Sequence, residues 1–478
     1  MALAGKPGTA AAIAISTNRC RRRRPGAGLL LAGLPLLLSG CGAAPASIGG
    51  LPAARLPLPA GITVAFNHNG AQRYRSPVSG RWRQGDDLEA MILAGIAEAR
   101  SEILVAVQEL SLPQVAAALV NRRRQGVSVK VVMENTYSTP WSEQHAADLV
   151  PHQRQRHDQL RALGQGDAVA ILRDGHVPML DDTADGSRGS GLMHHKFMVV
   201  DRRLVVTGSA NFTPSCIHGD ADDPRTRGNV NHLLRFDSPE LAAVFAAEFA
   251  RLWGDGPGGA ADSRFGTGKG GGGPQTVNVA GTPVQVLFAP HRRRDPDHGL
   301  HWLEQQLAGT RQRLDMALFV FSAQNLTDAM ARLRARHVRI RLLGDPGFAS
   351  RPFSELLDLL GVSLPDRRCR LEAGNRPWQQ VQQGVGSPRL PRGDKLHHKF
   401  AVIDGRSVIT GSFNWSPSAA HQNDETLIRI DSPLLARHFE VEMERLWRGA
   451  ELGLGGRLQR RQARARRDCP GLAATTIR

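Results

Sequence analysis

The chain of 478 residues is poor in aromatic residues and in cysteine. Phe, Trp and Tyr together make up 5% of it, which argues against a surface built for extensive stacking on nucleic-acid bases. Downstream of residue 41 only Cys216, Cys369 and Cys469 remain, too few for a disulfide framework, although one bridge can form. No group of Cys or His has the spacing of a zinc site. Disulfide-stapled and zinc-finger classes are therefore excluded.

Long apolar runs are also missing, and the one marked run, Gly28–Leu38, is too short to cross a bilayer. It follows the basic stretch Arg19–Arg24, an arrangement typical of an export signal. The run ends Leu38-Ser39-Gly40-Cys41, which resembles the bacterial lipobox, in which Cys41 would be lipidated and become the mature N-terminus. Acyl chains there predict an exported protein anchored to the outer face of a bacterial membrane, in the periplasm or at the cell surface. Secretion with cleavage near Ala43–Ala46, or an uncleaved anchor, stays open.

Positive charge is concentrated at the two ends of the chain. The formal net charge is +17, but residues 1–41 hold several basic residues and no acid, and the tail at Arg457–Arg467 reads RLQRRQARARR. The part between them is only mildly basic, which weakens the case for nucleic-acid binding by the whole chain. The tail either contacts phosphates of lipid or nucleic acid or is a solvated, disordered end.

One segment occurs twice, as His194-His195-Lys196-Phe-Met-Val-Val-Asp201 and as His397-His398-Lys399-Phe-Ala-Val-Ile-Asp404. Each copy is followed by Gly-Ser-x-Asn, at Gly208–Asn211 and Gly411–Asn414. The apolar residues between Lys and Asp predict a strand, and the apolar stretch after Asp predicts its hairpin partner. Because alternate residues of a strand share a face, the first His of each copy should point the same way as its Lys.

Two His, two Lys and two Asn that converge would suit a phosphodiester. One His could attack phosphorus and form a phosphohistidine, while the other protonates the leaving oxygen and then activates water or an alcohol. No metal or cofactor is expected, because Lys can replace the metal as the charge clamp, and adjacent His on a strand face opposite ways and chelate poorly. The residues expected to bind the phosphate oxygens are Lys196, Ser209, Asn211, Lys399, Ser412 and Asn414.

The double motif resembles that of the phospholipase D superfamily, whose signature is two copies of His-x-Lys-x4-Asp-x6-Gly-Ser-x-Asn. The resemblance spans roughly residues 62–253 and 277–448. It implies an α/β fold of two similar lobes, each a mixed β-sheet between helices, packed about a pseudo-twofold axis with both motifs at their interface. Family precedent favours His194 as the nucleophile and His397 as the general acid. The candidate catalytic residues are His194, Lys196, Asp201, Asn211, His397, Lys399, Asp404, Asn414 and Glu425, of which Asp201 and Asp404 look structural, placing the strand end.

The repeat extends beyond the motifs. Residues 229–253 and 423–447 share Asp-Ser-Pro and Arg-Leu-Trp at equal spacing, which predicts a strand followed by a Ser-capped helix. Helix–strand–helix–strand order is expected over 88–133 and again, in part, over 302–343, which favours an α/β sheet.

One difference between the copies bears on the chemistry, because Glu425 aligns with Asn231. Many family members carry a carboxylate at the Glu425 position that hydrogen-bonds a catalytic His. We therefore expect Glu425 to orient a His and the two histidines to differ in basicity, with a plain strand position as the alternative. Lobe 1 also has an insertion within Pro214–Gly228, whose polar residues either shape the site mouth or form a surface loop, and these are His218, Asp220 and Arg225.

These features divide the chain into a signal segment (1–41), a tether (42–60), lobe 1 (61–253), a flexible Gly-rich linker (254–276), lobe 2 (277–450) and a basic tail (451–478). Both half-sites lie in one chain, which favours a monomer.

The resemblance and the export signal together imply a metal-independent phospholipase D-like phosphodiesterase whose partner is a phospholipid at a membrane surface. It would hydrolyse or transphosphatidylate headgroup esters. One alternative is a metal-independent extracytoplasmic endonuclease acting on nucleic acid. Another is a cardiolipin synthase-type phosphatidyltransferase, although such enzymes typically carry N-terminal membrane helices that this sequence does not show.

Overall fold

The computed structural model describes residues 56–187, 189, 191–219, 223 and 225–472. The predicted signal segment and the lipidation site at Cys41 lie outside these residues, so both stay predictions. Residues Ala53–Arg478 constitute a compact unit of their own. In the described part of the chain, no helix combines the length and apolarity needed to cross a bilayer.

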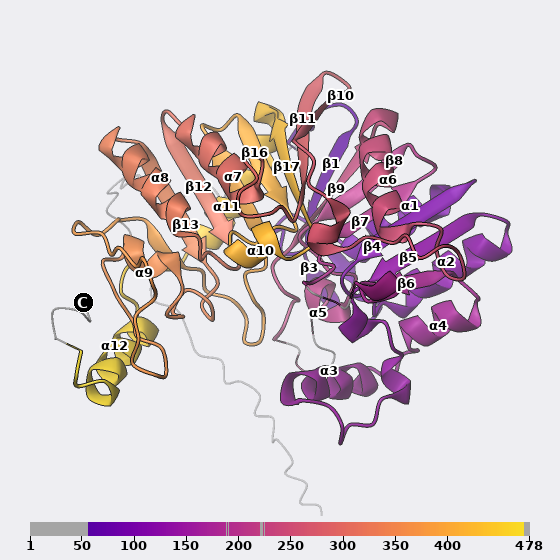
Figure 1. Ribbon diagram of the computed structural model, residues 1–478, viewed down its shortest axis with the longest axis horizontal. Coiled ribbons are helices and arrows are strands. Elements are labelled where there is room, and N and C mark those ends of the chain that lie inside the picture. Colours follow the sequence, from indigo (N-terminus) through magenta and orange to yellow (C-terminus); the bar gives the residue numbers. More distant parts are fainter. Residues whose placement is uncertain (1–55, 188, 190, 220–222, 224, 473–478) are drawn as a thin grey trace, which may run out of the picture. The chain divides into compact units, whose positions relative to one another are not determined.

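Two mixed sheets repeat one order of strands (Figure 1). The order β1-β9-β8-β7-β4-β5-β6 of the first sheet returns in the second as β11-β17-β16-β15-β12-β13-β14, with β10 and β18 added at its edges. The first sheet comprises β1 (Ile62–Phe66), β4 (Glu102–Val107), β5 (Ser128–Met133), β6 (Met179–Asp181), β7 (Lys196–Val200), β8 (Leu204–Gly208) and β9 (His232–Asp237). The second comprises β10 (Gln275–Val279), β11 (Thr282–Ala289), β12 (Arg313–Leu318), β13 (Arg339–Gly344), β14 (Val385–Ser387), β15 (Lys399–Ile403), β16 (Ser407–Gly411), β17 (Glu425–Asp431) and β18 (Glu451–Leu452). A separate hairpin pairs β2 (Arg73–Arg75) with β3 (Trp82–Gln84).

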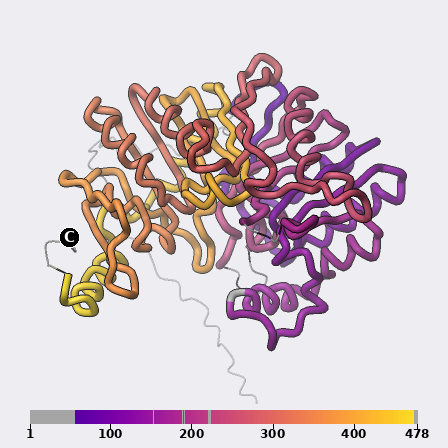
Figure 2. Tube along the Cα trace, in the orientation of Figure 1, coloured from indigo at the N-terminus to yellow at the C-terminus, as the bar shows by residue number. Residues whose placement is uncertain are grey.

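Helices cover both faces of each sheet, and the chain trace in Figure 2 follows the same succession of elements. One face of the first sheet packs on α1 (Leu88–Glu98), α2 (Pro113–Arg124) and α4 (Ala168–Asp174). One face of the second packs on α7 (Gly299–Ala308), α8 (Gln324–Ala335) and α9 (Glu355–Leu359). The remaining faces of both sheets share one apolar core with α6 (Pro239–Trp253) and α11 (Pro433–Trp447). Further helices are α3 (Pro151–Ala162), α5 (Pro214–Ile217), α10 (Pro417–His421) and α12 (Gly456–Asp468).

The shared helices α6 and α11 begin as the repeated Asp-Ser-Pro predicts. The hydroxyls of Ser238 and Ser432 accept hydrogen bonds from the amides of Leu241 and Leu435, each at 3.2 Å, and Pro occupies the first turn. The hairpins predicted after each motif are confirmed as β7–β8 and β15–β16. The two-lobed α/β fold is confirmed as well.

Asp201 and Asp404 follow β7 and β15 in the left-handed backbone region, with φ of 49° and 52°. Each carboxylate accepts hydrogen bonds from three consecutive backbone amides at the start of a neighbouring strand, those of Arg100, Ser101 and Glu102 in lobe 1 and of Arg311, Gln312 and Arg313 in lobe 2. These contacts lie at the opposite end of each strand from Lys196 and Lys399. Including the two aspartates among the catalytic residues is therefore wrong. Their contacts agree with the structural role expected for them, which is to place the end of the strand.

The Gly-rich segment 254–276 is anchored rather than flexible. Phe265 is buried in the shared core, and the ammonium of Lys269 lies between the carboxylates of Glu248 and Asp424, 2.7 Å from Asp424 Oδ1. Lys269 also donates to the carbonyl of Ala289 at 2.9 Å. The prediction of a flexible linker fails because one lysine in it compensates two buried carboxylates, which glycine content does not reveal.

The basic tail is helical over α12, so of the two alternatives left open for it, the disordered end does not hold there. Leu458 and Gln462 of α12 are buried, and a disulfide joins Cys369 to Cys469 immediately after the helix. Cys216 is a free, buried thiol.

Candidate active site

The two motifs are brought together because each is tied to the opposite lobe. The amide of His194 donates to the carbonyl of Asp424 at 2.9 Å, and the amide of His397 donates to that of Val230 at 3.0 Å. Asp424 and Val230 occupy equivalent positions of the repeat, so the two contacts mirror one another. One site therefore receives a histidine from each lobe.

His194 is oriented by a carboxylate of lobe 2. Its Nδ1 lies 2.8 Å from Oε2 of Glu425, which also accepts a hydrogen bond of 2.6 Å from the hydroxyl of Ser412. Glu425 is fully buried. Because a carboxylate can only accept, it selects the tautomer with the proton on Nδ1 and leaves Nε2 available for chemistry.

His397 is oriented by an amide of lobe 1 instead. Its Nδ1 lies 2.9 Å from Oδ1 of Asn231, and this oxygen accepts a hydrogen bond of 2.8 Å from the hydroxyl of Ser209. The Asn231 amide nitrogen donates to the carbonyls of Cys216 and Asn229, which fixes the side-chain orientation. His397 therefore also carries its proton on Nδ1, but beside a neutral group.

The hydroxyls of Ser209 and Ser412, which were expected to bind phosphate, donate to protein side chains instead. Both are buried and donate to the residue that orients the histidine of the other lobe. The preceding glycines permit this placement, because a Cβ on Gly208 would lie 2.4 Å from the carbonyl oxygen of His232, and one on Gly411 would lie 2.1 Å from that of Thr426. The glycines thus allow close approach of a neighbouring strand rather than of a ligand.

Lys196 and Lys399 are both buried and lie at the same site. Lys196 Nζ donates to the backbone carbonyl of His194 at 2.8 Å, and Lys399 Nζ donates to that of His397 at 2.7 Å. Burial lowers the pKa of Lys196 to about 8. It lowers the pKa of Lys399 well below the usual range, with the charge of Lys196 adding to the effect. Two buried ammonium groups that repel each other favour the binding of an anion between them.

Asn211 and Asn414 complete the two half-sites. The Asn211 amide nitrogen donates to Gln108 Oε1 at 3.2 Å, and the same oxygen lies 3.4 Å from Lys196 Nζ. The side-chain oxygens of both asparagines are buried and have no hydrogen-bond partner among the described residues. An unsatisfied amide oxygen accepts hydrogen bonds only, so these two atoms would be satisfied by a donor such as water or a hydroxyl group of a ligand.

The two histidines have lowered basicity to different degrees. Burial lowers the pKa of His194 to about 4, and the nearby Glu425 opposes this change. Burial and then the charges of Lys399 and Lys196 place the pKa of His397 well below its usual range. Both imidazoles are therefore neutral at pH 7, and an anion beside the lysines would favour protonation of His397.

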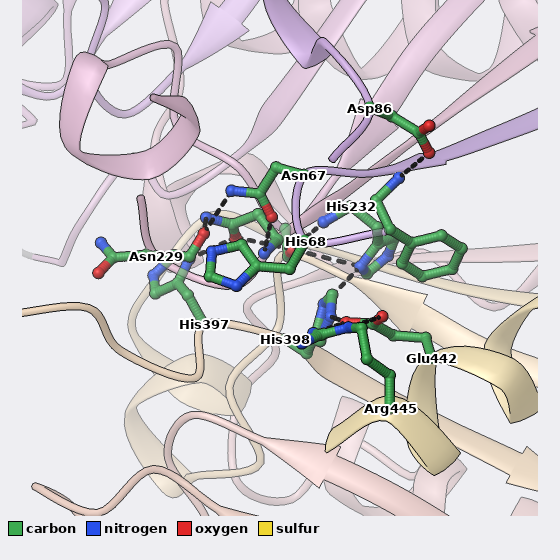
Figure 3. A network of polar contacts seen from close by, with 12 residues as sticks. Asn67, His68, Asp86, Asn229, His232, His397, His398, Glu442 and Arg445 are labelled. Atoms are coloured by element: carbon green, nitrogen blue, oxygen red, sulfur yellow. Dashed lines mark hydrogen bonds and ion pairs between the residues drawn. The ribbon is translucent and has the colours of Figure 1, made fainter. Parts of the chain in front are cut away.

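The second histidines of the motifs, His195 and His398, face away from the site, as strand alternation predicts. His195 contacts Glu248 at 3.1 Å and Thr426 at 2.8 Å. His398 contacts Glu442 and His232, each at 2.9 Å (Figure 3). These side chains form a polar layer between the lobes. The sequence analysis missed the two glutamates, although they stand at equal positions of the helical repeat.

One group in this layer, His195 with Glu248 and Asp424, has the composition of a cation site. The ammonium of Lys269 already lies between the two carboxylates and supplies the positive charge. It also lowers the pKa of Glu248 to about 2 against the effect of burial, which would raise it.

The insertion in lobe 1 does not bring His218 to the site mouth. His218 is fully buried, with Nε2 at 2.7 Å from Glu89 and Nδ1 at 2.9 Å from the Tyr74 hydroxyl. Arg225 is exposed and pairs with Asp223 at 2.7 Å, whereas Asp220 lies outside the described residues.

Comparison with known proteins agrees with this arrangement. A family model described as "Cardiolipin synthase, PLD-like domain" matches residues 92–253 and 303–447. The mitochondrial cardiolipin hydrolase of Xenopus laevis is 31% identical over 142 residues, which are 30% of this chain and 58% of the relative. A phospholipase D of Rickettsia prowazekii is 28% identical over 156 residues, 33% of this chain and 63% of the relative.

A solved structure extends the likeness of fold to both lobes. The phosphatidylserine synthase of Haemophilus influenzae Rd KW20 aligns with a TM-score of 0.51 at 14% identity, covering 87% of this chain and 98% of its own. Because the family model matches each lobe over its motif, the chain belongs to the phospholipase D superfamily, in the family of PLD-like domains described for cardiolipin synthase.

Proposed function

We propose that this protein is a phospholipase D-like phosphodiesterase that hydrolyses, or transphosphatidylates, phospholipid headgroup esters without a metal. The observation that carries the proposal is the pair of buried lysines, Lys196 and Lys399, between two Nδ1-anchored imidazoles from opposite lobes. A phosphodiester supplies the anion that the lysines need, with its phosphorus open to attack by one histidine and its leaving oxygen open to protonation by the other.

In the first step, Nε2 of neutral His194 attacks phosphorus and the bond to the leaving oxygen breaks. The imidazole becomes positively charged as it is phosphorylated, and Glu425, at 2.8 Å from Nδ1, stabilises that charge. His397 donates the proton that the leaving oxygen takes up. Burial, and then the charges of Lys399 and Lys196, lower the pKa of His397, and the bound phosphate offsets the contribution of the two lysines.

In the second step, His397 accepts a proton from water or an alcohol, whose oxygen attacks phosphorus. The bond between phosphorus and Nε2 of His194 breaks, and both histidines return to their starting state. Throughout, the two lysines and the amides of Asn211 and Asn414 hold the non-bridging oxygens.

A lipid substrate is supported by the matched relatives, whose names are cardiolipin hydrolase and phospholipase D. The export-type N-terminus and the disulfide between Cys369 and Cys469 support an oxidising compartment outside the cytoplasm. We propose lipidation at Cys41 as the means of anchoring. The chain supplies both half-sites, so a monomer suffices.

The test uses residues 42–478, which contain the whole compact unit, with phospholipid vesicles and with DNA in parallel, both in EDTA. His194→Asn and His397→Asn are the site variants, and His337→Asn is the matched control, because His337 is exposed in a turn with φ of 60°, which Asn tolerates. We expect headgroup release by the wild type and the control but not by the site variants. Cleavage of DNA with intact lipids would replace the lipid proposal with a nuclease, and loss of activity in EDTA would refute the metal-free mechanism.

A further inference from the structure

The two lobes place residues of different polarity next to the site at one equivalent position of the repeat. Val107 pairs with Lys196 across β4 and β7, and Leu318 pairs with Lys399 across β12 and β15, so the next residues correspond. In lobe 1 that residue is Gln108, which contacts Lys196 and Asn211 through its amide oxygen. In lobe 2 it is Phe319. One side of the site is therefore polar and the other apolar.

Phe319 begins a row of aromatic rings that leads from the site to the surface. Its ring centroid lies 4.7 Å from that of His397 and 4.6 Å from that of Phe348. Phe348 lies 6.4 Å from Phe353, whose side chain is 39% exposed. A row that starts at a reactive imidazole and ends in solvent is an apolar path to the site.

A strongly basic surface lies beside the outer end of this row. Arg351 places its guanidinium 5.9 Å from the ring of Phe348. Arg461 of α12 contacts the hydroxyl of Ser350 at 3.2 Å, and the disulfide between Cys369 and Cys469 holds the far end of the helix to lobe 2.

Helix α12 divides into a packed face and an arginine face. Leu458, Gln462 and Ala465 share the side turned to lobe 2. The helical spacing of i, i+3, i+7 and i+10 gathers exposed arginines on another side, namely Arg457, Arg460, Arg464 and Arg467. The charges of Arg351, Arg457 and Arg464 add to burial in lowering the pKa of Arg461, so these cations are crowded together. Such a surface is complementary to closely spaced phosphates.

We propose that this rim of lobe 2 is a membrane-docking surface that presents a phospholipid of the bilayer to the site. Phe353, at the exposed end of the row, would contact the apolar part of the bilayer, while Arg351 and the arginine face of α12 bind phosphates of an anionic bilayer. This inference rests on the proposed function and specifies how a lipid approaches the same site.

The binding test uses residues 42–478, without lipidation, and vesicles of phosphatidylglycerol and phosphatidylcholine at 3:7 or of phosphatidylcholine alone. The variant Arg457→Gln/Arg460→Gln/Arg464→Gln should bind the anionic vesicles on the order of 100-fold more weakly than the wild type. The matched control makes the same charge change at the far end of the lobe 1 sheet, with Arg100→Gln, Arg123→Gln and Arg124→Gln, and should bind within about threefold of the wild type. Equal binding by the wild type and the α12 variant would overturn the proposal.

The catalytic test compares vesicle lipids with bis(4-nitrophenyl) phosphate, a soluble phosphodiester. Phe353→Ser and the α12 variant should each release headgroups from vesicles on the order of 10-fold more slowly, but should hydrolyse the soluble ester within about twofold of the wild type. Thermal unfolding verifies that both variants fold. Equal losses on both substrates would refute a docking role.

Two further outcomes separate this inference from the proposed function. If no lipid is hydrolysed but vesicle binding still depends on the arginines of α12, the proposed function fails while docking stands. If the α12 variant loses binding to DNA in a gel-shift assay and keeps binding to vesicles, the arginine face contacts nucleic acid and the membrane proposal is wrong.

Discussion

Replacing Glu425 by Gln tests the asymmetry on which the assignment of roles depends. The substitution preserves side-chain size and removes only the charge that faces Nδ1 of His194 at 2.8 Å. It makes the His194 half-site resemble the His397 half-site, where the neutral Asn231 holds the imidazole at 2.9 Å. If His194 is the nucleophile, the imidazole loses the carboxylate that stabilises its positive charge in the phosphorylated state.

The size of the effect follows from the contact. A hydrogen bond to a charged group contributes about 1.5–3 kcal/mol, and about 1.4 kcal/mol is a factor of ten in rate. The rate of phosphohistidine formation should therefore fall roughly 10- to 150-fold. Because Glu425 raises the pKa of His194 against burial, its removal should also move the acid limb of kcat/KM from near pH 4 to lower pH.

The assay is stopped-flow release of nitrophenol from an activated phosphodiester across the pH range, with thermal unfolding to verify folding. Ser412→Ala is the matched control, because it removes the 2.6 Å hydrogen bond to Glu425 and keeps the charge, and it should cost less than Glu425→Gln. A Glu425→Gln variant with unchanged burst rate and unchanged acid limb would refute the reasoning.

Further predictions concern stability. Asp201→Ala should lower the free energy of unfolding by about 2–3 kcal/mol in urea denaturation, because its carboxylate accepts several backbone hydrogen bonds, yet leave kcat unchanged; a fall in kcat would return it to the site. Lys269→Met removes the ammonium that lies between two buried carboxylates and should cost about 3–5 kcal/mol in the same assay, whereas wild-type stability would show that the lysine is dispensable. His194 has a folded pKa of about 4 and an unfolded value of 6.5, so the unfolded state takes up the proton first as pH falls. Stability should therefore decline from pH 6.5 to pH 4, more in the wild type than in His194→Asn. Reduction of the disulfide between Cys369 and Cys469 should let α12 unfold more readily and so speed its cleavage by trypsin, and equal resistance before and after reduction would contradict this.

The parts of the fold that local sequence determines were predictable. The strands of both motifs follow from apolar runs of fitting length, and the start of α6 follows from Ser238 at the cap and Pro239 in the first turn. Comparing the repeats also singled out Glu425 as the position where the half-sites differ. Each of these inferences needs only neighbouring residues or the alignment of one half of the chain with the other.

What could not be predicted depends on contacts between distant segments. The partner of Glu425 is the histidine of the other lobe, 231 residues away, and the partners of Lys269 come from α6 and from the residue before β17. Ser209 was expected at the phosphate because its residue type fits, but its direction depends on how β8 lies against β9. The sequence left the order of the tail open, because that order depends on packing and on a disulfide with a sequence separation of 100.

The central claim is that one lobe supplies the nucleophile and the other the acid and base. The most direct measurement lets the His397→Asn variant react with bis(4-nitrophenyl) phosphate and stops the reaction rapidly without acid, which would hydrolyse phosphohistidine. Peptide mass spectrometry then locates the phosphorylated residue. The nitrophenolate needs no protonation to leave, so the phosphorylated enzyme should form and, lacking the base for its hydrolysis, accumulate on the peptide that contains His194. The roles would be reversed if His397 were phosphorylated in the His194→Asn variant while His194 stayed unmodified in the His397→Asn variant. The absence of phosphohistidine in both variants would contradict the covalent mechanism.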